Sequence, residues 1–363
     1  MSAEQPAAPA PRSGLAHFLQ TVWRARGIAA TLLLPISWVY RCVAACRRQA
    51  YAVGLKPIQK VDALVLVVGN VIVGGAGKTP TVISIVQHLQ ARGLHVGVIS
   101  RGYGRRSTVT LEVTPASSAR DVGDEPALVH HTTGAPVVVG ATRLHAAQTL
   151  LAHHPQTQIV VCDDGLQHYA LYRDLEVCVF DNRGSGNGWL LPAGPLREPW
   201  PRQALARAGQ SSEQLLVLHT GTQPAFAGYR ATRTLAIEGL LSDGTRIALT
   251  SLTHGGGKPL FAVAGIAQPQ AFFDMLGAAG IPLAGTLALP DHYDFDSWLR
   301  TSHKGYRLIC TEKDAQKLWQ VVPDAIAVPL VQTAEPAFWA ALDTAVDAHL
   351  SGQLSFPHGH KTS

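Results

Sequence analysis

The sequence predicts an α/β protein whose core is a mostly parallel β-sheet flanked by helices. From residue 61 to about residue 220, apolar strand-like runs alternate with helix-like segments. The runs are unbroken stretches rich in Val, Ile and Leu, which are typical of strands covered on both faces, whereas half-exposed strands alternate apolar and polar residues. The expected strands are residues 63–68, 95–100, 136–139, 158–162, 176–180 and 215–219.

The first of these runs leads into a glycine-rich loop and then into a helix-like segment. The loop contains Gly74-Gly75-Ala76-Gly77-Lys78-Thr79, the order that a phosphate-binding P-loop requires. Glycines let backbone N–H groups approach an anion closely, and the helix N-terminus and the Lys78 ammonium add positive charge. The strict motif has glycine where Ile72 stands, so the match is to a GGxGKT variant, and a tight turn without a ligand is the alternative.

The strands and the loop together predict a P-loop NTPase-like fold that binds ATP with Mg²⁺. Thr79 is expected to hold the Mg²⁺ through its hydroxyl group. The residues expected to contact the nucleotide phosphates are Ile72, Val73, Gly74, Gly75, Ala76, Gly77, Lys78 and Thr79.

Length and composition indicate a folded enzyme of roughly two domains. The chain has 363 residues, of which 47% are hydrophobic and 15% are charged, and its formal net charge is +5. This positive excess is too small to indicate a nucleic-acid partner, and none is expected. The five cysteines show no C-x-x-C spacing and the sixteen histidines no metal-ligand pattern, so we expect free thiols in a reducing compartment.

Residues 27–40 form an uncharged, mostly apolar run with arginines and aromatic residues around it. Its fourteen residues are short of the ~20 needed to cross a bilayer, and Arg47-Arg48-Gln49 is a poor signal-peptide cleavage site. Trp23, Trp38 and Tyr40 indicate instead a helix that lies in a membrane surface. The alternative is an amphipathic helix packed on the protein's own core.

Changes in composition divide the chain into six segments. Alternating residues around Ser242-Asp243-Gly244 predict a β-hairpin linker, and a new strand–helix pattern begins at Leu260. We expect a disordered tail (1–20), a membrane-associated helix (21–55), a P-loop domain (56–225), the β linker (226–250), a smaller second α/β domain (251–350) and a tail (351–363).

Two pairs of acidic residues are the candidates for metal and proton chemistry. Asp163 and Asp164 end a predicted strand beside the P-loop, where a carboxylate can hold Mg²⁺ directly or through water; a helix or turn cap is the alternative. Asp124 and Glu125 precede a helix-like segment. Asp124 can accept the proton of an acceptor hydroxyl or can simply be an N-cap, and Glu125 is a further candidate metal ligand.

Basic residues follow several predicted strands and are therefore expected at the same edge of the sheet. Arg101 and Arg143 each follow such a strand, and guanidinium groups there suit phosphate oxygens. A Gly- and Pro-rich stretch at 186–199 predicts an ordered loop that offers Arg197 and Glu198. The second domain offers His292, which alone is explained equally well by a structural role.

These motifs, in this order, resemble the tetraacyldisaccharide 4'-kinase family, the lipid A kinases of Gram-negative bacteria. The resemblance covers residues 23–318, whereas the extension up to Gly14 lies outside it. Several such motifs are far more specific than a P-loop alone. Besides Gly69-Asn70 and the P-loop they are Ser100-Arg101-Gly102-Tyr103-Gly104-Arg105, Val122-Gly123-Asp124-Glu125-Pro126, Asp163-Asp164-Gly165-Leu166-Gln167-His168, Leu191-Pro192-Ala193-Gly194-Pro195-Leu196-Arg197-Glu198, Pro290-Asp291-His292 and Thr311-Glu312-Lys313-Asp314-Ala315.

The resemblance implies transfer of the ATP γ-phosphate to the 4'-hydroxyl of a tetraacyldisaccharide 1-phosphate, which forms lipid IVA in lipid A biosynthesis. It implies that Asp124 is the proton acceptor, that His292 assists it, and that Asp163 and Asp164 lie near the metal. It also implies a monotopic protein on the cytoplasmic face of the inner membrane. The candidate catalytic set is Lys78, Arg101, Asp124, Arg143, Arg197, Glu198 and His292.

Without the resemblance, the residues indicate an Mg-ATP phosphotransferase at a membrane surface and do not identify the lipid. Two other functions are alternatives to this kinase. A membrane-associated NTPase switch would bind a partner protein and hydrolyse nucleotide slowly. Its GTP form is disfavoured because Thr311-Glu312-Lys313-Asp314 lacks the spacing that recognises guanine. A soluble ATP-dependent ligase or small-metabolite kinase is the third reading, and the apolar N-terminal helix argues against it.

Overall fold

The computed structural model describes residues 18–19, 21–202, 214–253, 257–295 and 304–354. The predicted tail at 1–20 lies almost wholly outside these residues. The predicted tail at 351–363 lies outside them from residue 355 onward, and its first four residues belong to the last helix.

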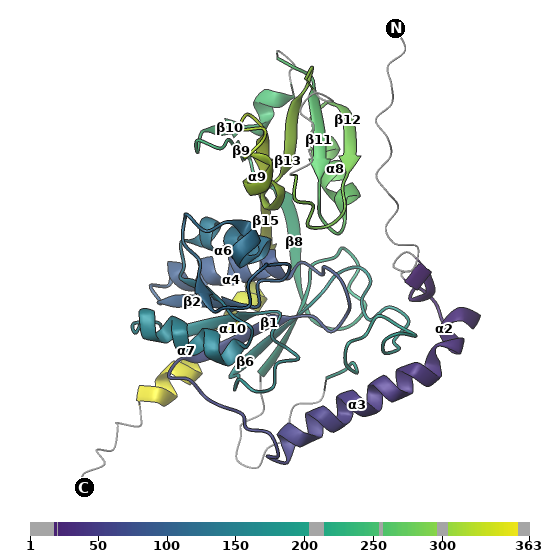
Figure 1. Cartoon of the computed structure of the whole chain (residues 1–363), viewed down its shortest axis with the longest axis vertical. Helices are drawn as coiled ribbons and strands as arrows, with labels where there is room; N and C mark the ends of the chain where they lie inside the picture. Colours follow the sequence, from purple (N-terminus) through teal and green to yellow (C-terminus); the bar gives the residue numbers. More distant parts are fainter. Residues whose placement is uncertain (1–17, 20, 203–213, 254–256, 296–303, 355–363) are drawn as a thin grey trace.

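A nine-stranded sheet forms the core of the larger part of the molecule (Figure 1). Its order is β15-β8-β7-β6-β1-β5-β2-β4-β3, and all neighbouring strands are parallel except the pairs β15–β8 and β3–β4 at the two edges. All six predicted strands are present within one residue of their expected bounds, which confirms the predicted mostly parallel sheet. The strands are β1 Leu64–Gly69, β2 Val96–Ser100, β3 Leu111–Glu112, β4 Val137–Val139, β5 Ile159–Asp163, β6 Leu175–Phe180, β7 Gln214–His219, β8 Tyr229–Leu235 and β15 Leu330–Ala334.

Both faces of this sheet are covered, which is why its central strands are apolar throughout. Every residue of β1 is buried: Leu64, Leu66 and Val68 face one core cluster, and the alternate residues face the other. The first cluster includes α4 and α10, and the second includes α7 and the loop segments that follow β5 and β6. The helices of this part are α4 Lys78–Ala91, α5 Ala119–Val122, α6 Asp124–Thr133, α7 Arg143–His153 and α10 Pro336–Leu354.

The smaller part of the molecule is a second α/β unit with its own six-stranded sheet, in the order β10-β9-β14-β13-β11-β12. Its core lies in two layers, one under α8 and one under α9. The elements are β9 Glu238–Leu240, β10 Arg246–Ala248, the 3-10 helix Leu249–Leu252, β11 Leu260–Ala264, α8 Pro269–Ala278, β12 Leu283–Ala288, β13 Arg307–Thr311, α9 Glu312–Leu318 and β14 Ile326–Val328.

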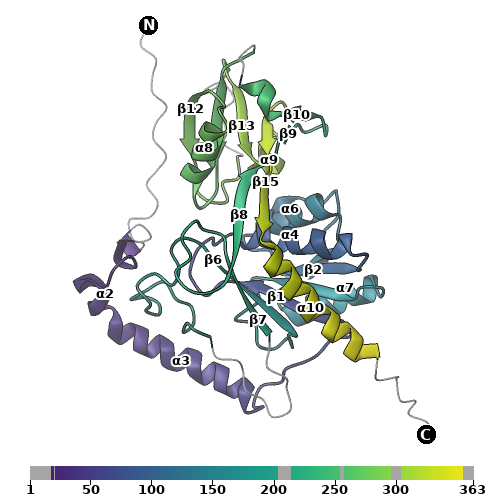
Figure 2. The same ribbon diagram turned by 180° about the vertical axis from the view of Figure 1, so that it is seen from behind.

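The predicted boundaries around this second domain need correction. The chain enters it through β8 and returns through β15, and these two strands pair antiparallel and extend the larger sheet (Figure 1). Only β9 and β10 of the segment 226–250 form the expected hairpin, which belongs to the smaller sheet. Residues after 329 return to the larger domain, where β15 pairs with β8 and α10 lies against the sheet (Figure 2). Phe338, Leu342 and Val346 of α10 are buried in its core.

The N-terminal segment forms two helices, α2 Ile28–Leu32 and α3 Leu34–Ala52, beside the larger domain (Figure 2). One side of α3 contacts the loop after β6: the Ser37 hydroxyl donates to the Leu190 carbonyl at 2.9 Å, and the Tyr40 hydroxyl donates to the Arg197 carbonyl at 2.7 Å. Within the described part of the chain, no helix combines the length and the hydropathy needed to span a bilayer.

Candidate active site

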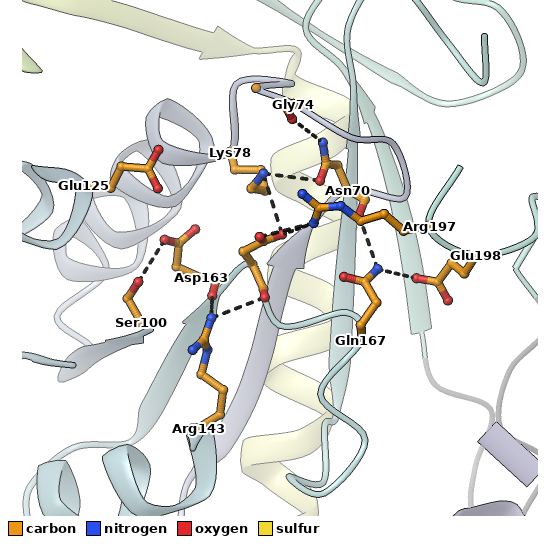
Figure 3. Close-up of polar contacts among 12 residues, drawn as sticks. Asn70, Gly74, Lys78, Ser100, Glu125, Arg143, Asp163, Gln167, Arg197 and Glu198 are labelled. Carbon is orange, nitrogen blue, oxygen red and sulfur yellow. Dashed lines mark hydrogen bonds and ion pairs between the residues drawn. The ribbon is translucent and has the colours of Figure 1, made fainter. Parts of the chain in front are cut away.

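The P-loop connects β1 to α4, as the sequence predicts. Gly77 has φ +84, a left-handed conformation that favours glycine, and it is the residue from which the helix starts. The Lys78 ammonium donates to Asn70 Oδ1 at 3.2 Å, and the Asn70 amide donates to the Gly74 carbonyl at 3.1 Å (Figure 3). Thr79 is the second residue of α4. Lys78 and Thr79 are thus both present at the helix N-terminus, where phosphate and metal ligands are expected.

The side chains of Ile72 and Ala76 cannot take part in nucleotide binding, since both are fully buried. Only their backbone groups remain as candidates. The loop carbonyls are held by side chains that the sequence did not suggest. Arg183 donates to the carbonyls of Val73 and Gly75 at 3.0 and 2.9 Å.

Thr220 and Arg233, from the larger sheet, bind another carbonyl of the P-loop. The Ala76 carbonyl accepts from the Thr220 hydroxyl and from Arg233, both at 3.0 Å. Thr220 directly follows strand β7, and this place at the carboxyl edge of the sheet could have identified it as a candidate site residue from the sequence. Arg233 lies within β8, and no local pattern distinguishes it from other arginines.

Asp163 and Asp164 lie at the end of β5 and face different partners. Asp163 is 3% exposed; its Oδ2 accepts from the Ser100 hydroxyl at 3.2 Å, and its Oδ1 has no partner among the described residues. Burial, together with the charges of Glu125 and Asp164, raises the pKa of Asp163 to about 7.

Asp164 is held ionised by two cations. Its backbone has φ +48, and its carboxylate lies 3.6 Å from the Lys78 ammonium and 3.2 Å from the Arg197 guanidinium. Although burial opposes it, the charges of Lys78 and Arg197 lower the pKa of Asp164. Arg197 and the P-loop lysine thus contact the same carboxylate, and the predicted catalytic role of Arg197 stays a prediction.

Arg143 binds the backbone of Asp163 and Asp164. It is 3% exposed and donates to the carbonyls of Asp163 and Asp164 at 2.9 and 3.4 Å (Figure 3). Its Nε and Nη1 are buried without a partner among the described residues. Arg101, in contrast, is exposed at the end of β2.

Glu198 lies in a buried polar network. Its Oε1 accepts from Gln167 at 2.6 Å, and its Oε2 accepts from Arg202 at 3.1 Å. The Gln167 amide also reaches the Asn70 carbonyl at 3.4 Å. These contacts describe a side chain that fixes the loop after β6 against the P-loop, and its predicted catalytic role stays a prediction.

The structure brings Asp124 and His292 together across the two domains. Asp124 Oδ2 lies 2.9 Å from His292 Nδ1 and 2.7 Å from the Lys317 ammonium. Although burial opposes it, hydrogen bonds from His292 and Lys317 lower the pKa of Asp124. Gly123, not Asp124, is the N-cap of α6, so the alternative of a simple capping role for Asp124 is wrong.

A cavity of about 230 Å³ adjoins this pair of residues. Asp124 and His292 line it together with Tyr103, Arg106 and Lys317. Glu125, the next residue of α6, lies 3.8 Å from the Lys313 ammonium. Within the described residues, no group of three or more His, Cys, Asp or Glu side chains is arranged to hold a metal ion by itself.

Comparison with known proteins decides the family. A model of the family described as Tetraacyldisaccharide-1-P 4'-kinase matches residues 29–350. The tetraacyldisaccharide 4'-kinase of Polaromonas naphthalenivorans (strain CJ2) is 52% identical over 350 residues, which are 95% of this chain and 99% of that protein. The chain belongs to the tetraacyldisaccharide-1-P 4'-kinase family.

Further similarities agree with membership in this family. The tetraacyldisaccharide 4'-kinase of Acidovorax sp. (strain JS42) is 52% identical over 93% of this chain and 96% of that protein. The crystal structure of "apo" form LpxK from Aquifex aeolicus in complex with ATP has a TM-score of 0.72 and 26% identity, and it matches 88% of this chain and 99% of that one. The predicted resemblance, the P-loop α/β fold and the classification as a tetraacyldisaccharide 4'-kinase are confirmed.

Proposed function

We propose that this kinase transfers the γ-phosphate of ATP to the 4'-hydroxyl of a tetraacyldisaccharide 1-phosphate and forms lipid IVA. The observation that carries the proposal is the hydrogen-bonded pair of Asp124 and His292 at the same end of the sheet as Lys78. The charges of Glu125, the residue after Asp124, and of Lys78 both act on the pKa of Asp163, which supports one site that includes the start of α6 and the P-loop.

The chain's residues supply three parts of such a reaction. Backbone N–H groups of the P-loop and the Lys78 ammonium bind the phosphates and stabilise the charge of the transferred group. His292 and Lys317 both contact Oδ2 of Asp124, so Oδ1 is the oxygen that accepts the proton of the 4'-hydroxyl. His292 orients the carboxylate through Oδ2, and the adjoining cavity receives the acceptor sugar.

Oxygen donors from β5, α4 and α6 would hold Mg²⁺ together with the nucleotide phosphates, because the described side chains do not form a complete metal site by themselves. Asp163 presents a buried carboxylate oxygen without a partner among the described residues, and Asp164, Glu125 and the Thr79 hydroxyl are the further oxygen ligands that this ion prefers. When bound, Mg²⁺ neutralises charge on the phosphate oxygens.

The lipid substrate accounts for the N-terminal helices. Large apolar side chains of α2 and α3 are exposed, with exposed fractions of 83% for Ile28, 74% for Leu32 and 61% for Trp38. From residue 21 to residue 61 the sequence has seven Lys and Arg residues and no acidic residue. Such a surface binds an anionic bilayer through buried apolar area and charge, and we propose a monotopic location on the cytoplasmic face of the inner membrane.

The test is transfer of labelled γ-phosphate from ATP to a tetraacyldisaccharide 1-phosphate in mixed micelles. We expect lipid phosphorylation that needs Mg²⁺, and none with an acceptor that lacks the 4'-hydroxyl. ATP hydrolysis without lipid transfer, or hydrolysis stimulated only by a protein partner, would favour the NTPase switch. Transfer to a soluble metabolite would favour a small-metabolite kinase.

A further inference from the structure

Helix α9 carries two lysines that none of the roles above uses. The Lys317 ammonium lies 2.7 Å from Asp124 Oδ2, and the Lys313 ammonium lies 3.8 Å from Glu125 and 3.3 Å from Asp291. Residues four apart lie on one face of a helix, so the pair presents two cations to two consecutive acids of α6. In both views α9 lies directly over α6 (Figures 1 and 2).

Lys317 also binds the loop that carries His292. Its ammonium lies 3.4 Å from the carbonyl of His292 and 3.2 Å from that of Tyr293. An ammonium has three N–H donors, and these two carbonyls and the Asp124 carboxylate occupy all three. One side chain thus holds both the proton acceptor and the backbone of its partner.

The start of α9 is fixed by a capping motif that explains why the lysines lie where they do. The Thr311 hydroxyl accepts from the Asp314 backbone N–H at 3.2 Å, which caps the helix. Asp314 Oδ2 in turn accepts from the Gly265 backbone N–H at 2.9 Å. The His292 backbone N–H donates to the Gly265 carbonyl at 3.1 Å, so α9 and the His292 loop are anchored to the same residue.

The contact between Lys317 and Asp124 is largely shielded from water. The side chain of Lys317 is 11% exposed and that of Asp124 is 7% exposed. Removing one member of such a pair leaves the other charge buried without compensation, which is far more disruptive than loss of a surface ion pair. The position of the Asp124 carboxylate is therefore expected to depend on Lys317.

We propose that Lys317 is a positioning residue for phosphoryl transfer, and that Lys313 supports it by holding α9 against α6. Lys317 and His292 share Oδ2 of Asp124, which leaves Oδ1 to meet the acceptor hydroxyl. The lysine pair thereby assembles a catalytic base on one domain with a histidine on the other. This inference rests on the proposed kinase function.

The first test compares Lys317→Met with Lys317→Arg, which keeps a cation at this position. We expect kcat for lipid phosphorylation to fall ~10²-fold in Lys317→Met, the loss typical of a misplaced catalytic group, with the Kd for ATP changed less than about twofold. Lys317→Arg should recover about a tenth or more of the wild-type rate. Lys258→Met, at an exposed lysine of the same domain, is the matched control and should behave as wild type.

A second measurement needs neither ATP nor lipid. The backbone N–H groups of His292 and Tyr293 are hydrogen-bonded, so their hydrogen exchange should be slow in the wild type. In Lys317→Met it should speed up by about tenfold or more, whereas amides of β11 and β13 keep their protection. Lys317→Gln, a polar neutral replacement, serves in its place if the methionine variant does not fold.

Wild-type kcat in folded Lys317→Met, or unchanged exchange at His292 and Tyr293, would overturn the positioning role. Equal kcat losses in the methionine and arginine variants would do the same. If the wild type phosphorylates no disaccharide lipid while exchange responds as expected, the kinase proposal fails and the link between α9 and the His292 loop stands.

Discussion

Two neighbouring aspartates at the end of β5 have opposite electrostatic environments. Asp163 is buried beside other carboxylates, which raises its pKa to about 7, whereas Lys78 and Arg197 keep Asp164 ionised in spite of burial. The positive φ of Asp164 turns the chain between them, so that each side chain meets a different set of partners. One acid thus balances the P-loop lysine, and the other presents an oxygen suited to a cation.

His168, a few residues farther along this loop, makes the stability of the protein depend on pH. Burial and the nearby charges of Arg143 and Arg47 lower its pKa to about 4. The unfolded chain takes up a proton near pH 6.5 and the folded protein does not, so stability falls as pH drops from about 6.5 to about 4. The full loss is up to about 3 kcal/mol, and about 2 kcal/mol of it is expected by pH 5.

Urea unfolding at pH 7.5 and pH 5.0 tests this dependence. The wild type should lose about 2 kcal/mol more between these two pH values than His168→Gln, which cannot be protonated. His131→Gln removes an exposed histidine and should keep the wild-type difference. Equal losses in the wild type and in His168→Gln would show that His168 is protonated in the folded state with its ordinary pKa.

At the scale of elements, the positions of the strands could be predicted from the sequence, but the strands with which they pair could not. Strands buried on both faces must be apolar along their whole length, so β1 and β5 were visible as unbroken runs. Sheet membership depends on contacts between distant segments. For this reason β8 and β15, which both belong to the larger sheet, could not be assigned to a sheet from local pattern.

The exposed face of α2 and α3 leads to a prediction about membrane binding. Its four most informative side chains are Ile28, Leu32, Trp38 and Val43, each more than half exposed. Replacing all four with Ser should lower binding to vesicles that contain anionic lipid by tenfold or more, since each buried apolar side chain contributes roughly 1.5–3 kcal/mol. Co-flotation with vesicles of phosphatidylethanolamine and phosphatidylglycerol measures the change.

The control for this variant is Ile237→Ser, at a side chain that is 85% exposed between β8 and β9. It removes exposed apolar area away from the N-terminal helices and should leave vesicle binding unchanged. Melting temperatures of both variants should equal that of the wild type, because the replaced side chains are exposed. Unchanged flotation of the fourfold variant would favour α3 as a helix that serves only to pack on the loop after β6.

At the scale of the whole molecule, the site is made by two domains that meet at α6. Local motifs gave Lys78, Asp124, Asp163 and His292 as candidates one by one, but only the P-loop and Asp163 were placed by the rule that parallel strands bring their carboxyl ends to one edge. Arg233 lies within a strand and Lys317 within a helix, and no local sequence motif marks either of them as a site residue. The position of Arg233 depends on the pairing of β8 with β7, and that of Lys317 on the packing of α9 against α6, and local sequence specifies neither.

The contact between Asp124 and His292 predicts that replacing either residue removes the same contribution to kcat. Asp124→Asn keeps the shape of the side chain without its charge, and His292→Asn suits a backbone with φ +62, a conformation that Asn tolerates well. Each variant should lower kcat by ~10²–10⁴ with little change in the Kd for ATP. The double variant should lose much less than the product of the two effects, because residues that act as one unit are not additive.

Single-turnover kinetics with saturating ATP, combined with melting curves, separates this outcome from others. Melting temperatures near that of the wild type would show that the lost rate reflects chemistry and not unfolding. If the double variant loses the full product of the single effects, Asp124 and His292 act independently. His292 would then serve the acceptor or the phosphate directly, and Asp124 would rely on Lys317 alone to hold the orientation in which Oδ1 meets the acceptor hydroxyl.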